Sequence, residues 1–331
     1  MDLITHEEFE ELLAAFALDA CDADETTAIE QYMAAHPEVG HEVERLRTAA
    51  AGLAASDALA PPRDVRNGVL QRAREARAPR ARTPLEVHAE VESALAELLD
   101  ELPASAHDLP TLNGLTVREL VAHLAAMESL LALWLGVPTL PGVDDEDVVA
   151  RTATVVAVTH DWSFPEVTAL WRRSMAAVRA AAPDDATSRW FGSEMPTDLV
   201  LVIRAFETWT HTDDIRRALG RALDLPSAAA LRTMAEGSMT LVPSAMESSG
   251  LTRPGRTARF VLTGAGGGEW NVAMASGTEA GEPDVALTLP VADWCRRFSE
   301  RLSAEDLDVM VSGDRGLGAD LIEAASVFAS L

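Results

Sequence analysis

The segment from about Pro196 to Leu219 most strongly constrains the fold, because its pattern predicts one long helix that carries two potential metal ligands. Gly220 suits the C-terminal end of this helix. Its apolar residues recur at helical spacing: Leu199, Ile203, Phe206, Ile215 and Leu219. Glu207 and His211 are four residues apart, so both project from one helical face. Such a pair can bind one metal ion, form a hydrogen bond, or be two surface residues, and a third ligand would separate these alternatives.

His123 is the candidate third ligand. It lies within a predicted helix that begins at Thr116, where Thr116 and Glu119 form a capping-box signature, and runs to about Leu135. A single histidine between apolar neighbours is more often a satisfied core residue than a ligand. Inward His and Glu residues on facing helices of a bundle commonly build metal sites, however. Two histidines and one carboxylate leave a coordination position open, which is typical of a catalytic metal site.

Four long helical patterns predict an antiparallel bundle within residues 85–248. They cover Leu85 to Leu102, Thr116 to Leu135, Phe164 to Ala182 and Pro196 to Leu219. Glu128 and His160 are further polar candidates near this bundle. We interpret His160 as a loop or capping residue, because it lies in an interhelical connection.

Two motifs of the bundle resemble the DinB-like, mycothiol-dependent maleylpyruvate isomerase family. They are NGLTVRELVAHL over residues 113–124, and Glu207-x3-His211-x2-Asp214-x3-Ala218-Leu219-Gly220. The resemblance implies that His123, Glu207 and His211 bind a divalent metal, usually zinc, which activates the thiol of mycothiol, a thiol of actinobacteria. A Lewis acid lowers the pKa of a thiol, and the thiolate is the nucleophile. The residue types alone suit several metals.

The residues beside the candidate ligands match the family pattern less well. Thr210, Thr212 and Asp213 do not match the family pattern, so contacts to substrate are not predicted from them. Asp214 could orient a histidine ligand from behind, or pair with Arg217 at the helix surface. We expect both Asp214 and Arg315, the latter from the C-terminal part, to contact the thiol cofactor site.

Residues 1–78 predict a small helical domain, followed by a linker at 79–84. The predicted helices cover His6 to Ala20, Glu25 to Ala35, Pro37 to about Leu53, and Arg63 to Ala76. So short a unit usually completes its core with a metal or a partner. The runs ELLAAFALDA over 11–20, DADE over 22–25 and AAHPE over 34–38 resemble the N-terminal domain of anti-sigma factors. That resemblance implies that the helices clamp a sigma factor.

The zinc ligands of the anti-sigma family are incomplete in this sequence. His6 and His36 match its histidine positions, but Gly40 and Val43 occupy the cysteine positions. A structural zinc site needs four good donors, so we expect this domain to be free of zinc. The alternative interpretation of residues 1–78 is a helical dimerisation or packing module.

Residues 249–331 predict a small α+β domain. The expected order is three strands, a helix, a strand and a final helix, with a glycine-rich hairpin turn at 264–268. Val311 to Asp314 and the final helix resemble the sterol-carrier-like C-terminal domain of the same isomerase family. Cys295 is expected to be a buried helix residue.

Charge and composition exclude several classes of protein. With 53 acidic and 27 basic residues, the net charge of −26 disfavours direct nucleic-acid binding and suits a basic protein partner. No apolar run approaches the roughly 20 residues of a membrane span. The first residues lack the basic and apolar regions of a signal peptide. Two distant cysteines, Cys21 and Cys295, fit a cytoplasmic location.

These patterns predict a mainly α-helical chain with two competing functions. The first is a cytoplasmic anti-sigma factor that regulates transcription by sequestering a sigma factor, with a metal- and thiol-binding sensor domain. The alternative is a mycothiol-dependent isomerase or thiol S-transferase with a helical N-terminal appendage. A metal-free structural protein is the third possibility.

Overall fold

The computed structural model describes residues 4–56, 82–111, 114–182, 187–190 and 193–327 of the 331-residue chain. The chain divides into two compact units, residues 1–72 and 73–331, which are considered separately. The helix predicted over residues 63–76 lies outside the described residues, as does the linker up to residue 81.

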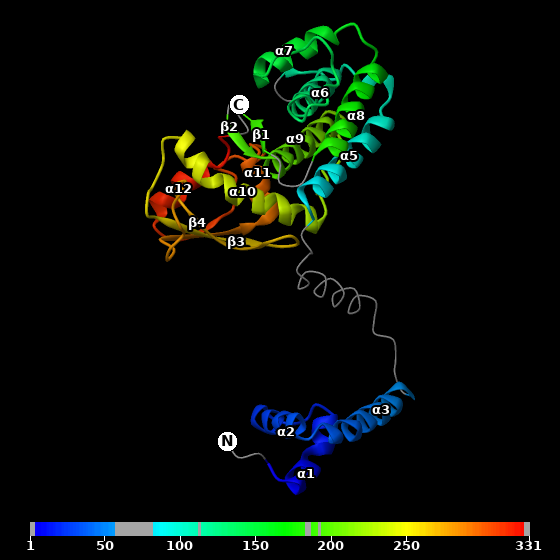
Figure 1. The fold of residues 1–331 in the computed structure, drawn as a ribbon, viewed down its shortest axis with the longest axis vertical. Coiled ribbons are helices and arrows are strands. Elements are labelled where there is room, and N and C mark those ends of the chain that lie inside the picture. Colours follow the sequence, from blue (N-terminus) through cyan, green and yellow to red (C-terminus); the bar gives the residue numbers. More distant parts are fainter. Residues whose placement is uncertain (1–3, 57–81, 112–113, 183–186, 191–192, 328–331) are drawn as a thin grey trace. The chain divides into compact units, whose positions relative to one another are not determined.

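The N-terminal unit consists of helices α1 (His6–Ala17), α2 (Ala23–Ala35) and α3 (Gly40–Ser56), with a 3-10 turn, η1 (Pro37–Val39), before α3 (Figure 1). Thr5 and Asp22 cap α1 and α2 through capping boxes, which fixes where these two helices begin. The three predicted helices within the described residues are therefore confirmed.

The core of this unit is apolar and aromatic. Its buried residues are Phe9, Leu13, Phe16, Ile29, Tyr32 and Val43. His6 and His36, the candidate zinc histidines, both contact Tyr32. The Tyr32 hydroxyl lies 3.0 Å from Nδ1 of His6, and the Tyr32 ring stacks on His36 with centroids 4.4 Å apart. Val43, at a cysteine position of the anti-sigma family, packs within the apolar core.

Four long helices of the second unit pack around one core. They are α5 (Pro84–Asp100), α6 (Val117–Trp134), α8 (Phe164–Ala181) and α9 (Thr197–Ala218). Capping boxes at Thr83, Thr116 and Ser163 start α5, α6 and α8. Fully buried Leu95, Leu124 and Trp171 belong to their shared core. Together with the C-terminal sheet described below, these helices confirm the prediction of a mainly helical chain with a small sheet.

Three elements between α6 and α9 in the chain were not predicted. Helix α7 (Val148–Val158) packs on α6, and strands β1 (Thr187–Trp190) and β2 (Ser193–Pro196) form an antiparallel hairpin. Arg151 is buried and holds α7 in place by donating hydrogen bonds to the carbonyls of Ala126, Val143 and Asp145. Because α7 is held by a buried arginine, hydrophobic spacing alone does not mark it.

The C-terminal part is a four-stranded sheet covered on one face by helices (Figure 1). The strands are β3 (Thr257–Thr263), β4 (Gly268–Ala273), β5 (Val285–Pro290) and β6 (Met310–Gly313). Their order is β4-β3-β5-β6, with β3 and β5 parallel and the other pairs antiparallel. The helices are α10 (Ala228–Ser248), α11 (Val291–Phe298) and α12 (Arg315–Ala324). Except for α10, this matches the predicted element order.

Helix α10 joins the sheet to the four long helices. Its buried side chains share one core with the sheet and with residues of α5 and α9. A Cβ atom at Gly237 of α10 would lie 2.6 Å from a methyl group of Val202 on α9, so glycine permits this close approach. The C-terminal part is thereby packed against α9, which carries two of the predicted metal ligands.

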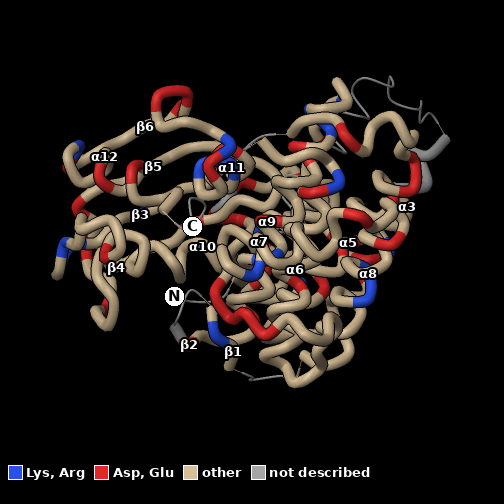
Figure 2. The backbone as a smooth tube through the Cα atoms, turned by 90° about the horizontal axis from the view of Figure 1, so that it is seen from above, with Lys and Arg blue, Asp and Glu red and all other residues tan. Residues whose placement is uncertain are grey.

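Acidic residues are spread along the helices and loops, with basic residues scattered among them (Figure 2). Many basic side chains are held in ion pairs, such as that of Arg256 with Asp284 and Asp314. Within the described part of the chain, no helix combines the length and apolar character required to cross a bilayer.

Candidate metal centre

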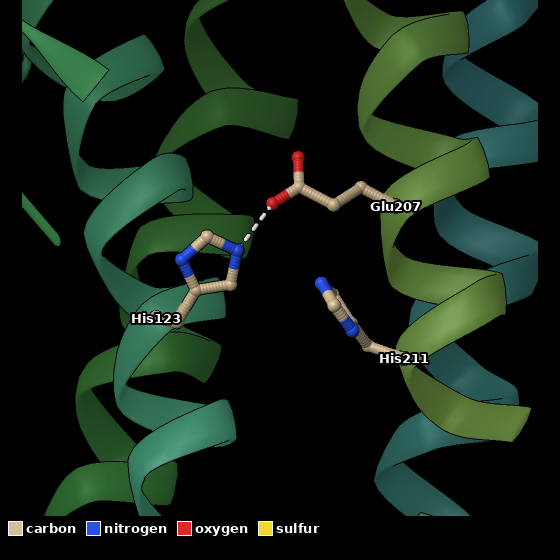
Figure 3. Close-up of side chains that lie close together, drawn as sticks. All are labelled: His123, Glu207 and His211. Atoms are coloured by element: carbon tan, nitrogen blue, oxygen red, sulfur yellow. Dashed lines mark ion pairs between the residues drawn. The ribbon is translucent and has the colours of Figure 1, made fainter. Parts of the chain in front are cut away.

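Helices α6 and α9 bring the three predicted ligands together. One ligand atom each from His123, Glu207 and His211 forms a group whose members all lie within 4.8 Å of one another. Figure 3 shows His123 projecting from α6 toward Glu207 and His211, which project from consecutive turns of α9. Nε2 of His123 lies 2.7 Å from Oε1 of Glu207. The rings of His123 and His211 are nearly perpendicular, with centroids 5.2 Å apart.

Hydrogen bonds behind the cluster orient both imidazole rings. Nδ1 of His211 lies 3.0 Å from Oδ2 of Asp214, and because a carboxylate only accepts, Nδ1 carries the proton. Nδ1 of His123 lies 3.1 Å from the hydroxyl of Thr152 on α7, which can accept in the same way. His211 is then left with an unprotonated Nε2, the form in which histidine binds a metal. Nε2 of His123 faces the Glu207 carboxylate at 2.7 Å, and it takes the same form when the Thr152 hydroxyl accepts from Nδ1.

Burial keeps both imidazoles neutral. It lowers the pKa of His123 to about 4, and the positive charge of Arg204 acts in the same direction. Burial also lowers the pKa of His211 to about 4, against the opposing effect of its hydrogen bond to Asp214. Neutral histidines at pH 7 need not lose a proton before they bind a cation.

Asp214 links the candidate ligand His211 to the C-terminal part of the unit. Its buried carboxylate accepts from Nε and Nη2 of Arg301 at 3.0 and 2.7 Å, and from Nη1 of Arg217 at 3.2 Å. Both roles considered for Asp214, orienting His211 and pairing with Arg217, therefore occur together. Burial alone would raise the pKa of Asp214, but His211 and Arg301 lower it. The carboxylate is thus ionised at neutral pH.

Arg301, a residue that sequence analysis missed, reaches α9 from the turn after α11. Glu300, just before it, adopts a left-handed conformation with φ of 56°. Arg301 then bonds through its backbone N–H to the carbonyl of Arg296, closing the helix end. Arg315, the predicted contact from this part of the chain, is exposed at the first position of α12. A buried carboxylate near the end of a helix gives no sequence signal for a partner 87 residues away.

The two other polar candidates, Glu128 and His160, differ in burial. Glu128 is fully buried between His88 and Arg204, whereas His160 is exposed after α7. His88 and Arg204 were also missed, because each occupies an otherwise ordinary position in a helical pattern. Among the described residues, His123, Glu207 and His211 form the one group of three or more His, Cys, Asp and Glu side chains that could hold a metal.

The arrangement fits a divalent cation. Tetrahedral zinc with bonds of about 2.0–2.1 Å needs donor atoms separated by roughly 3.3 Å, which small side-chain movements achieve here. The side chains of His123 and Glu207 are 18% and 22% exposed, so one side of the cluster is open to solvent. Three protein ligands with one accessible side leave room for a further ligand.

Comparison with known proteins relates this part of the chain to a thiol-dependent isomerase. Residues 88–216 match the family model of the mycothiol maleylpyruvate isomerase N-terminal domain. This range contains the three candidate metal ligands and Asp214. It lies wholly within the second unit and so does not bear on the helices of the N-terminal unit.

Similar proteins and structures were also found. Two proteins of Mycobacterium tuberculosis, from strains CDC 1551 and H37Rv, are each 26% identical over 233 residues, covering 66% of this chain and 84% of theirs. Both carry the description "uncharacterized protein". A crystal structure of the mycothiol-dependent maleylpyruvate isomerase covers 69% of this chain and 91% of its own, with a TM-score of 0.44 and 18% identity. A point mutant of that enzyme gives a TM-score of 0.48, 14% identity, and coverage of 68% and 91%.

Proposed function

We propose that the second unit is a metal-dependent enzyme that uses a low-molecular-weight thiol of the mycothiol type, in an isomerisation or S-transfer reaction on a small substrate. The observation that carries this proposal is the convergence of His123, Glu207 and His211 at an accessible position between α6 and α9. The match of residues 88–216 to the mycothiol maleylpyruvate isomerase N-terminal domain supports the choice of thiol.

The residues of this chain would prepare the site in three ways. A bound divalent metal supplies Lewis acidity that lowers the pKa of a thiol and stabilises the thiolate. Glu207 provides one negative charge, and the neutral rings of His123 and His211 provide none. A divalent ion in this ligand set therefore keeps a net positive charge, which favours an anionic fourth ligand. Asp214 and Thr152 hold the two rings so that their Nε2 atoms face the same position.

Thiol binding is expected to require the metal. Cobalt-substituted protein should develop a near-ultraviolet sulfur-to-cobalt charge-transfer band when mycothiol is added, because the thiolate occupies the open position. Protein treated with a chelator should show neither this band nor heat of mycothiol binding in calorimetry. S-methylated mycothiol is the matched control, since it keeps the shape but cannot form a thiolate. Equal binding of mycothiol with and without metal would contradict the proposal.

A second candidate function concerns the N-terminal unit, because it forms a separate compact unit with its own core. We propose that its helices capture a sigma factor, as the sequence resemblance implies. The full chain should then retain a sigma factor through affinity purification from the source cells, whereas a chain that begins at residue 73 should not. Failure of the full chain to retain any sigma factor would refute this function and leave the proposed enzyme unaffected.

A further inference from the structure

A row of fully buried polar groups crosses the helices behind the candidate metal ligands. His88 on α5, Glu128 on α6 and Arg204 on α9 each have no exposed side-chain surface. Oε2 of Glu128 lies 3.2 Å from Nε2 of His88, and Oε1 accepts from Nε of Arg204 at 2.8 Å. Each oxygen of Glu128 thus has a partner on a different helix.

The same arginine contacts the metal ligand Glu207. Nη1 of Arg204 donates to Oε2 of Glu207, one turn along α9. The other oxygen of Glu207, Oε1, faces Nε2 of His123 at 2.7 Å. The two carboxylate oxygens are therefore divided between the guanidinium group behind the site and the imidazole groups at the site, an orientation visible in Figure 3 for the His123 side.

Glu128 compensates the charge of Arg204. Burial alone would raise the pKa of Glu128, but Arg204 and His88 together bring it down to about 2, so the glutamate is ionised. A buried charge without a partner is strongly destabilising, whereas this pair is close to neutral as a whole. The ring of Trp190 lies 5.5 Å from the guanidinium carbon and adds a cation–π contact. Arg204 is accordingly held in one orientation from three sides.

We propose that Arg204, held by Glu128 and His88, is a positioning residue that keeps Glu207 a single-oxygen metal ligand. The inference rests on the proposed metal site. By binding Oε2, Arg204 opposes coordination of the metal through both oxygens of Glu207. Two-oxygen coordination would fill the position that two histidines and one carboxylate otherwise leave open. The buried ion pair thereby preserves the place where a thiolate or substrate oxygen binds.

The test uses a charge-neutral change. The double variant Arg204→Gln/Glu128→Gln removes one positive and one negative charge, so the net charge near the metal stays the same. We expect zinc affinity, measured by competition with a chelator in the full chain, to fall roughly 10- to 100-fold, as is usual when an outer partner of a ligand is lost. The visible spectrum of bound cobalt should weaken, because higher coordination numbers give weaker d–d absorption than four-coordinate sites.

Arg204→Lys provides a second variant if the double variant does not fold. Lysine keeps the charge opposite Glu128 but lacks the planar fork that contacts two carboxylates at once. It should give the same weakening of the cobalt spectrum. Arg297→Gln is the matched control, because Arg297 is a buried arginine of the C-terminal part that donates to the carbonyls of Ile322 and Glu323. It should lower the melting temperature without changing zinc affinity or the cobalt spectrum.

The outcomes separate this inference from the proposed function. If wild-type protein binds neither zinc nor cobalt, the metal site itself is refuted. If wild-type protein binds metal, and the folded double variant or Arg204→Lys binds it within twofold of wild type with an unchanged cobalt spectrum, the positioning role of Arg204 is refuted while the metal site stands.

Discussion

Replacement of His211 by alanine is expected to remove metal binding almost completely. The substitution deletes one of three protein ligands, so the loss in zinc affinity should exceed the roughly 10- to 100-fold cost of removing an outer partner. Asp214 keeps Arg301 and Arg217 as partners in the variant, so the protein should still fold. Metal content after dialysis, measured by atomic emission, should fall from about one ion per chain to background.

The loss of zinc binding should also appear in the effect of zinc on the melting temperature. A ligand that binds only the folded state raises the free energy of unfolding with its concentration, so zinc should raise the melting temperature of the wild-type protein. It should not do so for His211→Ala or His123→Ala. His160→Ala is the matched control, because His160 is an exposed histidine of the same unit outside the cluster. Retention of a full equivalent of zinc by either ligand variant would show that the metal lies elsewhere.

The grouping of the three candidate ligands could be predicted from sequence because local geometry encodes most of it. A spacing of four residues places Glu207 and His211 on one face of α9 without any tertiary information. The capping box at Thr116 fixes where α6 begins, and His123 lies two turns further along this helix. Only the pairing of the two helices had to be assumed, and the family resemblance supplied it.

The groups that support the ligands could not be predicted in this way. Arg301 meets Asp214 because α10 packs the sheet against α9, and that packing depends on a core shared by distant segments. Helix α7, which brings Thr152 to His123, is fixed by the buried Arg151. Tertiary contacts of this kind override the local pattern, so these residues are visible only in the folded chain.

The Asp214–Arg301 ion pair is expected to stabilise the fold and to hold the ring of His211, the candidate metal ligand, in place. Asp214→Ala leaves the partly buried Arg301 without its carboxylate, and breaking a buried pair by removing one partner costs up to about 3–5 kcal/mol. Arg301→Met should cost less, because Asp214 keeps Arg217 and His211 as partners. Urea unfolding of the metal-free protein measures the free energy of unfolding of both variants. The double variant Asp214→Ala/Arg301→Met should lose less of this free energy than the sum of the two single losses, by roughly 0.5–3 kcal/mol.

Asp213→Ala is the matched control for the metal-dependent part of this prediction. Asp213 is also buried on α9, but it lies about 200° around the helix from His211 and pairs with Arg216 at 3.7 Å. Zinc affinity should fall about 10- to 100-fold in Asp214→Ala, because the His211 ring loses the acceptor that fixes its proton on Nδ1. It should stay at the wild-type value in Asp213→Ala. Equal losses in the two variants would mean that Asp214 acts only through the stability of α9, because a general weakening of that helix does not distinguish its two faces.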